Sequence, residues 1–449
     1  MKHTVIEKIF REHAEEEVKP GSIVWINLDV VSARDFGGPN VVKNYRKAYG
    51  SSQVFDAGKV FFTFDLTVPP KTIQYANNQQ VCRDFAGEQG IKVYDVDQGI
   101  GTHTFIEQGF ALPGTIVVGT DSHMNILGAV NCFGQGMGDV DITFGFRFGR
   151  TWFQVPETVK VVLKGKPQAA FSAKDLTLYI LGVLKTGKLL GKAVEFYGPA
   201  VENLDLAGRI TLLSMITEMG GIVGFIPFRG AAPPAHEGPE NSTSNRRGKQ
   251  ARFSNKPPGS NNKDTAEELK QINGLSSLPA EVRADEGGHY AETIEIDVSG
   301  IGPMVSEPPY PHNVKKITEI EKVKVDFGFI GSCTNGRIED LEAARRILKG
   351  KQLAPGVRLA VVPATRAVYY EAMERGILFD LLKAGAIISN PGCGGCAQGH
   401  IGMTGKGEVM VSTGNRNFPG KQGDGQNYLT SPEVVAYSVL KGYLSAPPE

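Results

Sequence analysis

The stretch NPGCGGC at residues 390–396 comes just after a short apolar run, Ala386 to Ile388, and a second cysteine stretch, GSCTN at residues 331–335, follows the apolar run Phe327 to Ile330. Short apolar runs bounded by turn residues are typical of buried strands. In open α/β sheets, ligands bind outside the carboxyl ends of the strands. We therefore expect one sheet edge to carry three thiols, those of Cys333, Cys393 and Cys396.

The same pattern recurs along the last third of the chain. We predict four strands there, at residues 327–330, 359–362, 386–388 and 409–412, with helices near residues 339–348 and 367–375. Three of these strands lead into polar or cysteine-bearing motifs, the third being TGNR at residues 413–416. Motifs at successive strand ends indicate one site built along the edge of a sheet.

Short strand-like runs alternate with helical segments throughout the chain, which predicts parallel sheets in three α/β units, at residues 1–157, 158–318 and 319–449. The other expected strands are 24–28, 60–64, 93–96, 115–119, 159–163, 194–199 and 293–298, and the other expected helices are 71–87, 174–184 and 206–219. Residues 229–264 are too polar to bury much surface, so we predict a flexible loop there, with regular structure resuming near Tyr290.

The composition narrows the class of protein. The 449 residues carry 48 basic and 48 acidic side chains, so the net charge is zero, and no basic run indicates binding to nucleic acid or to a membrane surface. No apolar run approaches the ~20 residues that span a bilayer. Residues 1–17 have the spacing of a packed helix, not of a signal peptide. The odd number of cysteines, five, argues against a disulfide framework, so Cys82 and Cys132 are expected to be core thiols and the location cytoplasmic.

Three thiols at one sheet edge leave several chemical interpretations open. The pair Cys393 and Cys396 alone is also typical of a redox CxxC motif or of half a zinc site. With Cys333 and a histidine such as His400, the pair would complete a structural zinc site. Complete iron–sulfur clusters also normally take four protein ligands. A [4Fe–4S] cluster held by only three cysteines would leave one iron open as a Lewis acid.

Taken together, GSCTNGR at residues 331–337, NPGCGGC at 390–396 and NRNF at 415–418 resemble motifs of the aconitase superfamily, in particular of the large subunits of isopropylmalate isomerase and homoaconitase. The resemblance runs from about Val5 to Leu444, and only residues 229–284 look foreign to it. It implies a three-domain α/β architecture that lacks the C-terminal swivel domain, and a [4Fe–4S] cluster held by the three cysteines. It also implies a hydro-lyase that dehydrates and rehydrates a hydroxy di- or tricarboxylic acid, together with a small subunit that carries the swivel domain and the catalytic base.

The resemblance further implies roles for individual residues. Residues 121–123 resemble the family's Asp–Ser–His motif beside the cluster, and Glu218 resembles a glutamate that supports the bound water. Arg416 resembles an arginine that clamps a substrate carboxylate, and Arg337 is a second choice that is equally typical of a surface residue at a helix N-terminus. The implied catalytic residues are His103, Asp121, His123 and Glu218, and the implied substrate-binding residues are Ser122, Arg337, Arg416 and Lys421.

Four positions depart from the family's pattern. The family usually has a histidine where Thr102 stands, and His103 comes one residue late, which along an extended segment would turn the side chain to the other face. Leu66 stands where many relatives have histidine, Ser214 replaces an asparagine, and Lys421 replaces an arginine. Lysine does not reproduce a bidentate clamp. These differences predict a diverged member whose substrate contacts are retuned.

The leading hypothesis is therefore the large subunit of a 3-isopropylmalate dehydratase-like enzyme. The large subunit of homoaconitase, or of a dimethylmalate- or citramalate-type dehydratase, is an alternative, because the small subunit carries much of the side-chain preference in this family. A non-catalytic iron–sulfur sensor that binds RNA without its cluster would be a different class of protein. The zero net charge counts against it.

Overall fold

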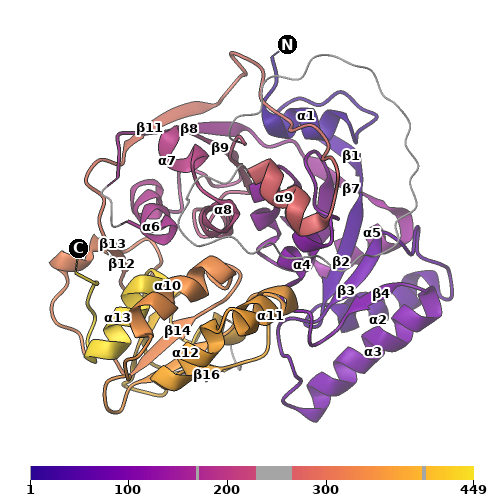
Figure 1. Ribbon diagram of the computed structural model, residues 1–449. Helices are drawn as coiled ribbons and strands as arrows, with labels where there is room; N and C mark the ends of the chain where they lie inside the picture. Colours follow the sequence, from indigo (N-terminus) through magenta and orange to yellow (C-terminus); the bar gives the residue numbers. More distant parts are fainter. Residues whose placement is uncertain (1, 168–170, 229–264, 397–400, 449) are drawn as a thin grey trace.

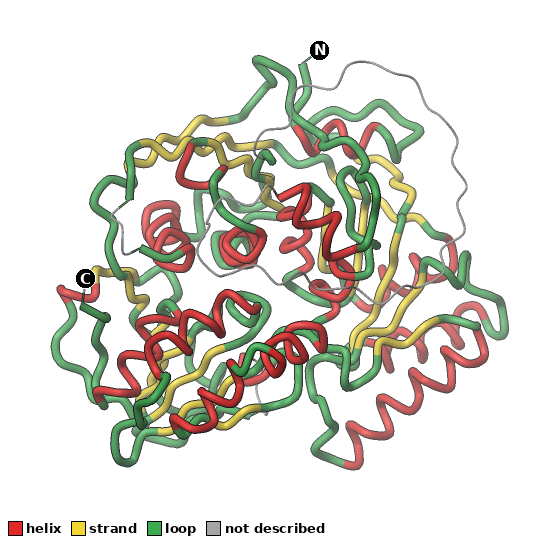
Figure 2. The backbone as a smooth tube through the Cα atoms, in the orientation of Figure 1, coloured by secondary structure: helices red, strands yellow, loops and turns green. Residues whose placement is uncertain are grey.

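Three β-sheets flanked by helices make up the structure (Figure 1). The computed structural model describes residues 2–167, 171–228, 265–396 and 401–448. Within these residues the sheets have five, four and seven strands, and a two-stranded ribbon is separate from them. Figure 2 shows strands and helices interspersed through the molecule, so the predicted α/β class is confirmed. Among the described residues, no helix combines the length and the apolar character that crossing a membrane requires.

The first sheet is entirely parallel, in the order β4-β3-β2-β5-β6. Its strands are β2 (Val30–Arg34), β3 (Val60–Thr63), β4 (Lys92–Tyr94), β5 (Ile116–Gly119) and β6 (Phe133–Gly136). The helices of this part are α1 (Val5–Arg11), α2 (Gly38–Tyr49), α3 (Ile73–Gln89), α4 (Gly101–Glu107), α5 (Asp139–Phe148) and the 3-10 helix η1 (Met124–Val130). Strands β3 and β5 are buried along their whole length, and buried strands of parallel sheets consist mainly of apolar residues. This explains why apolar runs in the sequence predicted both strands.

The strand predicted at residues 24–28 exists, but it does not belong to the parallel sheet. It is β1 (Ile23–Asn27), which pairs antiparallel with β7 (Arg150–Gln154). Residues of β1 alternate between exposed and buried, as expected of a ribbon with one face in water. Parallel pairing was therefore the wrong prediction for this strand. The central position in the sheet is taken by β2, which the sequence patterns did not single out.

The second sheet is also parallel, in the order β10-β9-β8-β11. Its strands are β8 (Thr158–Lys164), β9 (Ala193–Tyr197), β10 (Val223–Phe225) and β11 (Glu292–Asp297), and its helices are α6 (Ala173–Leu184), α7 (Pro199–Glu202), α8 (Leu206–Ser214) and α9 (Thr265–Asn273). Two expectations were wrong here. The helix predicted to reach residue 219 ends at Ser214, where turns begin. The described residues already form a helix at Thr265, well before Tyr290, and this helix, α9, buries Glu268 and Leu269.

The loop predicted at residues 229–264 lies outside the described residues. Helix α9 falls within the segment, residues 229–284, that looked foreign to the family. It packs against α4 of the first unit, and Glu268 accepts a hydrogen bond from the backbone N–H of Leu206 at the start of α8. The described end of this segment is therefore part of the packed structure.

The third sheet has the order β13-β12-β18-β17-β14-β15-β16. Its strands are β12 (Met304–Ser306), β13 (Val314–Lys316), β14 (Phe327–Ile330), β15 (Arg358–Val361), β16 (Ile387–Ile388), β17 (Val409–Ser412) and β18 (Gln426–Leu429). Its helices are α10 (Ile338–Leu348), α11 (Arg366–Glu374), α12 (Ile377–Ala384), α13 (Pro432–Lys441) and the 3-10 helices η2 (Ile317–Glu319) and η3 (Gly394–Cys396). The four predicted strands are confirmed and are parallel neighbours. Strands β12 and β13 of this sheet lie before residue 319, the predicted start of the third unit. The boundaries of the three units stay predictions.

The apolar core does not stop at the borders between sheets. One buried cluster includes Val30 and Phe61 of the first sheet, Val161 of the second and Leu429 of the third. Two of the cysteines, Cys333 and Cys393, are also buried in this cluster. The cysteine-bearing edge of the third sheet is therefore packed between the units, where side chains from all three can reach it.

Candidate active site

The three cysteines follow the carboxyl ends of two parallel strands of the third sheet. β14 leads to Cys333, and β16 leads to Cys393 and then, through η3, to Cys396. All three are free thiols that are 5–9% exposed. The turn before Cys333 requires glycine, since a Cβ added at Gly331 (φ +150°) would stand 2.6 Å from the carbonyl oxygen of Val362. The short strands and tight turns thus fix the thiols at one sheet edge.

Asn415, in the loop after β17, joins two of these thiols to a histidine. Its Oδ1 accepts a hydrogen bond from the sulfur of Cys396 at 3.1 Å, and its Nδ2 donates to the sulfur of Cys333 at 3.6 Å. The same Nδ2 lies 2.8 Å from Nε2 of His123. The amide is fully buried, so it holds the cysteine edge and the Asp–Ser–His segment in one fixed arrangement.

His123 belongs to a buried charged group with Glu218 and Arg416. Glu218 Oε1 accepts a hydrogen bond from Arg416 Nε at 2.6 Å and lies 3.3 Å from His123 Nε2. Burial alone would raise the pKa of Glu218, but the charges of His123 and Arg416 outweigh it and hold this pKa below its usual value. Glu218 is therefore an ionised partner for both neighbours, although it lies in the turn after α8 and not on the helix.

The other two residues of the Asp–Ser–His segment orient the same histidine. Asp121 accepts a hydrogen bond from the backbone N–H of His123 at 3.0 Å, and Ser122 Oγ lies 3.1 Å from His123 Nδ1. Burial would raise the pKa of Asp121, but the guanidinium of Arg34, 3.1 Å away, is the main reason that it is lowered. Asp121 is thus held as a carboxylate.

His103 lies on a helix, α4, and not on the extended segment assumed in the argument about its shifted position. On a helix a shift of one residue rotates a side chain by about 100° and does not reverse its face. His103 Nε2 lies 3.0 Å from the carbonyl oxygen of Cys333, so it still contacts the cysteine loop. Burial, helped by the charge of Arg337, lowers the pKa of His103 to about 3, which keeps this imidazole neutral.

The remaining predicted residues lie further from this group. Arg337 is buried before α10, and its Nη1 stands 3.8 Å from Glu107 of α4. Lys421 is half-buried, and its backbone N–H donates to the carbonyl oxygen of Phe418. His400, the possible fourth zinc ligand, lies outside the described residues. The structure thus gives Arg337 an ion-pair partner within the chain, and substrate binding by Arg337 and Lys421 stays a prediction.

Known proteins resemble this chain over most of its length. A family model described as "Aconitase family (aconitate hydratase)" matches residues 7–232 and 312–442, which include all three cysteines and the residues around His123 and Arg416. The chain belongs to the aconitase family. The resemblance seen in the sequence motifs is therefore confirmed, and membership of this family implies an iron–sulfur cluster.

Several curated members of the family match along their whole length. The chain is 37% identical over 451 residues to "3-isopropylmalate dehydratase large subunit 1" of Thermotoga maritima, with 100% of this chain and 99% of that protein covered. It is also 37% identical to the 3-isopropylmalate dehydratase large subunit of Hydrogenobaculum sp. (100% and 98% covered) and to the probable one of Methanothermobacter thermautotrophicus (100% and 99%). A solved structure, aconitase X of Thermococcus kodakaraensis, aligns with a TM-score of 0.48 at 12% identity over 92% of this chain and 89% of that one.

Buried cysteine thiols are suitable ligands for an iron–sulfur cluster, and membership of the aconitase family implies such a cluster. In a cubane cluster each cysteine binds a different iron, so the thiols need not share one centre. Burial raises the pKa of Cys333 and Cys393 well above the usual value, so these thiols need positive partners to act as thiolates.

Two buried cations at the site were missed by the sequence analysis. Arg34, at the end of β2, donates to the sulfur of Cys393 at 2.9 Å. Lys174, on α6, donates to the carbonyl oxygens of Thr413 and Gly414 at 3.0 and 2.7 Å, directly before Asn415. Lysine and arginine are usually exposed, so neither residue type signals burial. For Arg34, the only available signal was the start of a polar stretch after the apolar run of β2.

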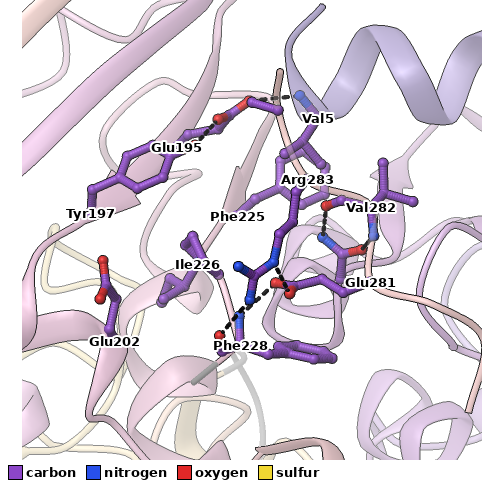
Figure 3. A pocket seen from close by; sticks show the side chains of 13 residues that line it. Val5, Glu195, Tyr197, Glu202, Phe225, Ile226, Phe228, Glu281, Val282 and Arg283 are labelled. Carbon is purple, nitrogen blue, oxygen red and sulfur yellow. Dashed lines mark hydrogen bonds and ion pairs between the residues drawn. The ribbon is translucent and has the colours of Figure 1, made fainter. Parts of the chain in front are cut away.

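A pocket of about 380 Å³ lies apart from these residues, and none of the predicted site residues lines it. It is formed by α1, β9, β10 and the segment 281–284, as Figure 3 shows. Its charged groups are engaged within the chain: Arg283 donates to Glu281 at 2.6 Å and to the carbonyl oxygen of Phe228 at 2.9 Å. The carboxylate of Glu195 accepts from the backbone of Val5 and from Tyr197. We assign no function to this pocket.

Proposed function

We propose that this chain is the large subunit of a [4Fe–4S] hydro-lyase of the 3-isopropylmalate dehydratase type. The observation that carries the proposal is the buried group in which Asn415 joins the cysteine edge to His123, Glu218 and Arg416. The full-length similarity to 3-isopropylmalate dehydratase large subunits supports the substrate class, a hydroxy dicarboxylic acid.

Cys333, Cys393 and Cys396 would hold the cluster. When bound, a cluster with three protein ligands supplies an open iron as a Lewis acid for the hydroxyl group that leaves. The chain's own groups bind part of the substrate and supply the proton that the leaving hydroxyl takes up.

Arg416 is the proposed anchor for a substrate carboxylate. Among the described residues its ion pair with Glu218 uses only Nε, so both terminal nitrogens can donate to a second carboxylate. Its side chain is 20% exposed, whereas that of Glu218 is 3% exposed. The guanidinium therefore bridges a buried anion on one side and an accessible space on the other.

His123 is the proposed proton donor to the leaving hydroxyl. Glu218, 3.3 Å from Nε2, favours positive charge on the ring, and Ser122 on its Nδ1 side fixes the plane of the ring. Because the Nδ2 group of Asn415 can only donate, it must turn away from Nε2 when that nitrogen takes up a proton. Asp121 holds the backbone N–H of His123 and so fixes the position of the residue. We also propose that His103 is a catalytic residue and that Lys421 binds the substrate.

The proposal includes a partner. The relatives are named large subunits, which implies a small subunit. We propose that the small subunit carries the swivel domain, the base that removes the carbon-bound proton and much of the side-chain pocket. All five cysteines are free in the structure, which supports a reducing compartment, and we propose the cytoplasm.

The test is anaerobic co-purification with the candidate small subunit, followed by an ultraviolet assay for alkene formation from a panel of malate derivatives. Cys393→Ser should abolish both the visible absorption of the cluster and turnover. Cys82→Ala, which removes a buried thiol of the first unit, serves as the matched control and should retain both. Turnover by a Cys393→Ser protein without a cluster would refute the mechanism, and a cluster without turnover of any derivative would refute the substrate class.

A further inference from the structure

Arg34 is a buried cation to which the proposed function gives no role. Its side chain is 11% exposed. Nε and Nη2 donate to Asp65 Oδ1 at 2.9 and 2.5 Å, and Nη1 lies 3.1 Å from Asp121 Oδ1. Nη2 also donates to the sulfur of Cys393 at 2.9 Å. All three nitrogens of the guanidinium are thus engaged, so Arg34 has no free edge for a substrate.

The contacts of Asp65 show that Arg34 lies at a junction between two units. The carbonyl oxygen of Asp65 accepts a hydrogen bond from the backbone N–H of Cys393 at 2.9 Å. Oδ2 of the same residue accepts from the backbone N–H of Gly101, at the start of the helix that carries His103, at 2.9 Å. The first unit therefore holds the cysteine loop of the third through the backbone of Asp65, the guanidinium of Arg34 and the carbonyl oxygen of Val68, which accepts a hydrogen bond from Asn390 Nδ2 at 2.8 Å.

We propose that Arg34 is a positioning residue of the cluster centre, which donates a hydrogen bond to the sulfur of Cys393 and places a fixed positive charge beside the thiolates. This inference rests on the proposed [4Fe–4S] function. Hydrogen bonds to ligand sulfurs and the local net charge set the reduction potential of a cluster. Both contributions of Arg34 favour the more negative, reduced state, so the loss of Arg34 lowers the potential.

The surrounding charges give the inference a sign that can be tested. The groups that face Arg34 are Asp35, Asp65, Asp121 and Cys393. Removing the cation by Arg34→Gln should make the cluster harder to reduce. Removing an anion by Asp65→Asn should make it easier to reduce. General damage to the fold would not shift the potential in opposite directions in the two variants.

The experiment is a redox titration monitored by electron paramagnetic resonance, on the holoenzyme assembled with its small subunit. We expect a lower midpoint potential for Arg34→Gln and a higher one for Asp65→Asn. The control is Arg83→Gln, because Arg83 pairs with Asp95 on the first unit at 2.6 and 2.7 Å. The potential of this control should equal that of the wild type.

Resonance Raman spectra supply a second measurement, because loss of an N–H···S bond changes the iron–sulfur stretching frequency at Cys393. Arg34→Lys keeps the charge but cannot reach Asp65, Asp121 and the sulfur together, so its spectrum should shift even if Arg34→Gln does not fold. The inference would be overturned if the wild type holds a cluster and both Arg34 variants show its reduction potential and its Raman bands unchanged. A wild-type protein without any cluster would instead refute the proposed function.

Discussion

Replacing Glu218 by glutamine tests the charged group at the centre of the site. Glu218 is 3% exposed and accepts a 2.6 Å hydrogen bond from Arg416, with His123 at 3.3 Å. Removing one partner of a buried ion pair costs about 3–5 kcal/mol. Because Arg416 is one-fifth exposed and an amide oxygen can still accept a hydrogen bond, we expect the lower end, about 3 kcal/mol of unfolding free energy. Loss of proton transfer should reduce kcat about 100-fold or more.

The pH dependence of this loss has a defined sign. The pKa of Glu218 is lower in the folded chain than the usual 4.5, so its stabilising contribution is present above pH 4.5. It is lost as the pH falls through the folded-state pKa. Glutamine does not titrate, so the difference between wild type and Glu218→Gln should be full at pH 7 and smaller at pH 4.

The assay is urea-induced unfolding of the chain at both pH values, followed by fluorescence. Glu374→Gln is the control, because Glu374 is exposed on α11, and it should change the stability by less than about 0.5 kcal/mol. A cost for Glu218→Gln of under about 0.5 kcal/mol at pH 7, or an equal cost at both pH values, would refute this reasoning.

Three further predictions follow from the same site. Lys174→Met leaves the carbonyl oxygens of Thr413 and Gly414 without the lysine donor and should lower the free energy of unfolding at pH 7 by about 2–5 kcal/mol. An unchanged melting temperature would contradict this prediction. Because burial lowers the pKa of Lys174 to about 8 while the unfolded lysine titrates near 10.5, the wild type should gain stability between these pH values and Lys174→Met should not. Arg416→Lys should lower kcat/KM by about tenfold or more while the visible spectrum of the cluster persists, and an unchanged kcat/KM would remove Arg416 from the substrate site. Air should abolish dehydration, and ferrous iron with thiol should restore it; activity that is stable in air would contradict an open iron.

The sequence was most informative where structure is locally encoded. The four strands of the third sheet were predicted because each is a short apolar run, and three of these runs lead into glycine, cysteine or polar motifs. Their parallel order then places Cys333, Cys393 and Arg416 along one edge. Local pattern and sheet geometry together were sufficient for this part of the site.

Features that depend on distant partners could not be predicted. Lys174 is buried because it meets carbonyl oxygens 239 and 240 residues further along the chain, which no local pattern contains. Helix α8 ends at Ser214, but the first glycines after it stand at 220 and 221. The predicted helix therefore continued past Glu218, which in fact lies in a turn. The setting of His103 was misjudged because a seven-residue helix between two loops has too few residues to show a periodicity.

The hydrogen bonds of the site connect residues that are far apart in the chain, which has a consequence for biosynthesis. Arg34 and Cys393 are separated by 359 positions, and His123 and Asn415 by 292. Synthesis must therefore extend to Arg416 before the buried hydrogen-bonded group of the site can form. Until then its thiols have no complete set of neighbours, so loading of the cluster follows synthesis of nearly the whole polypeptide.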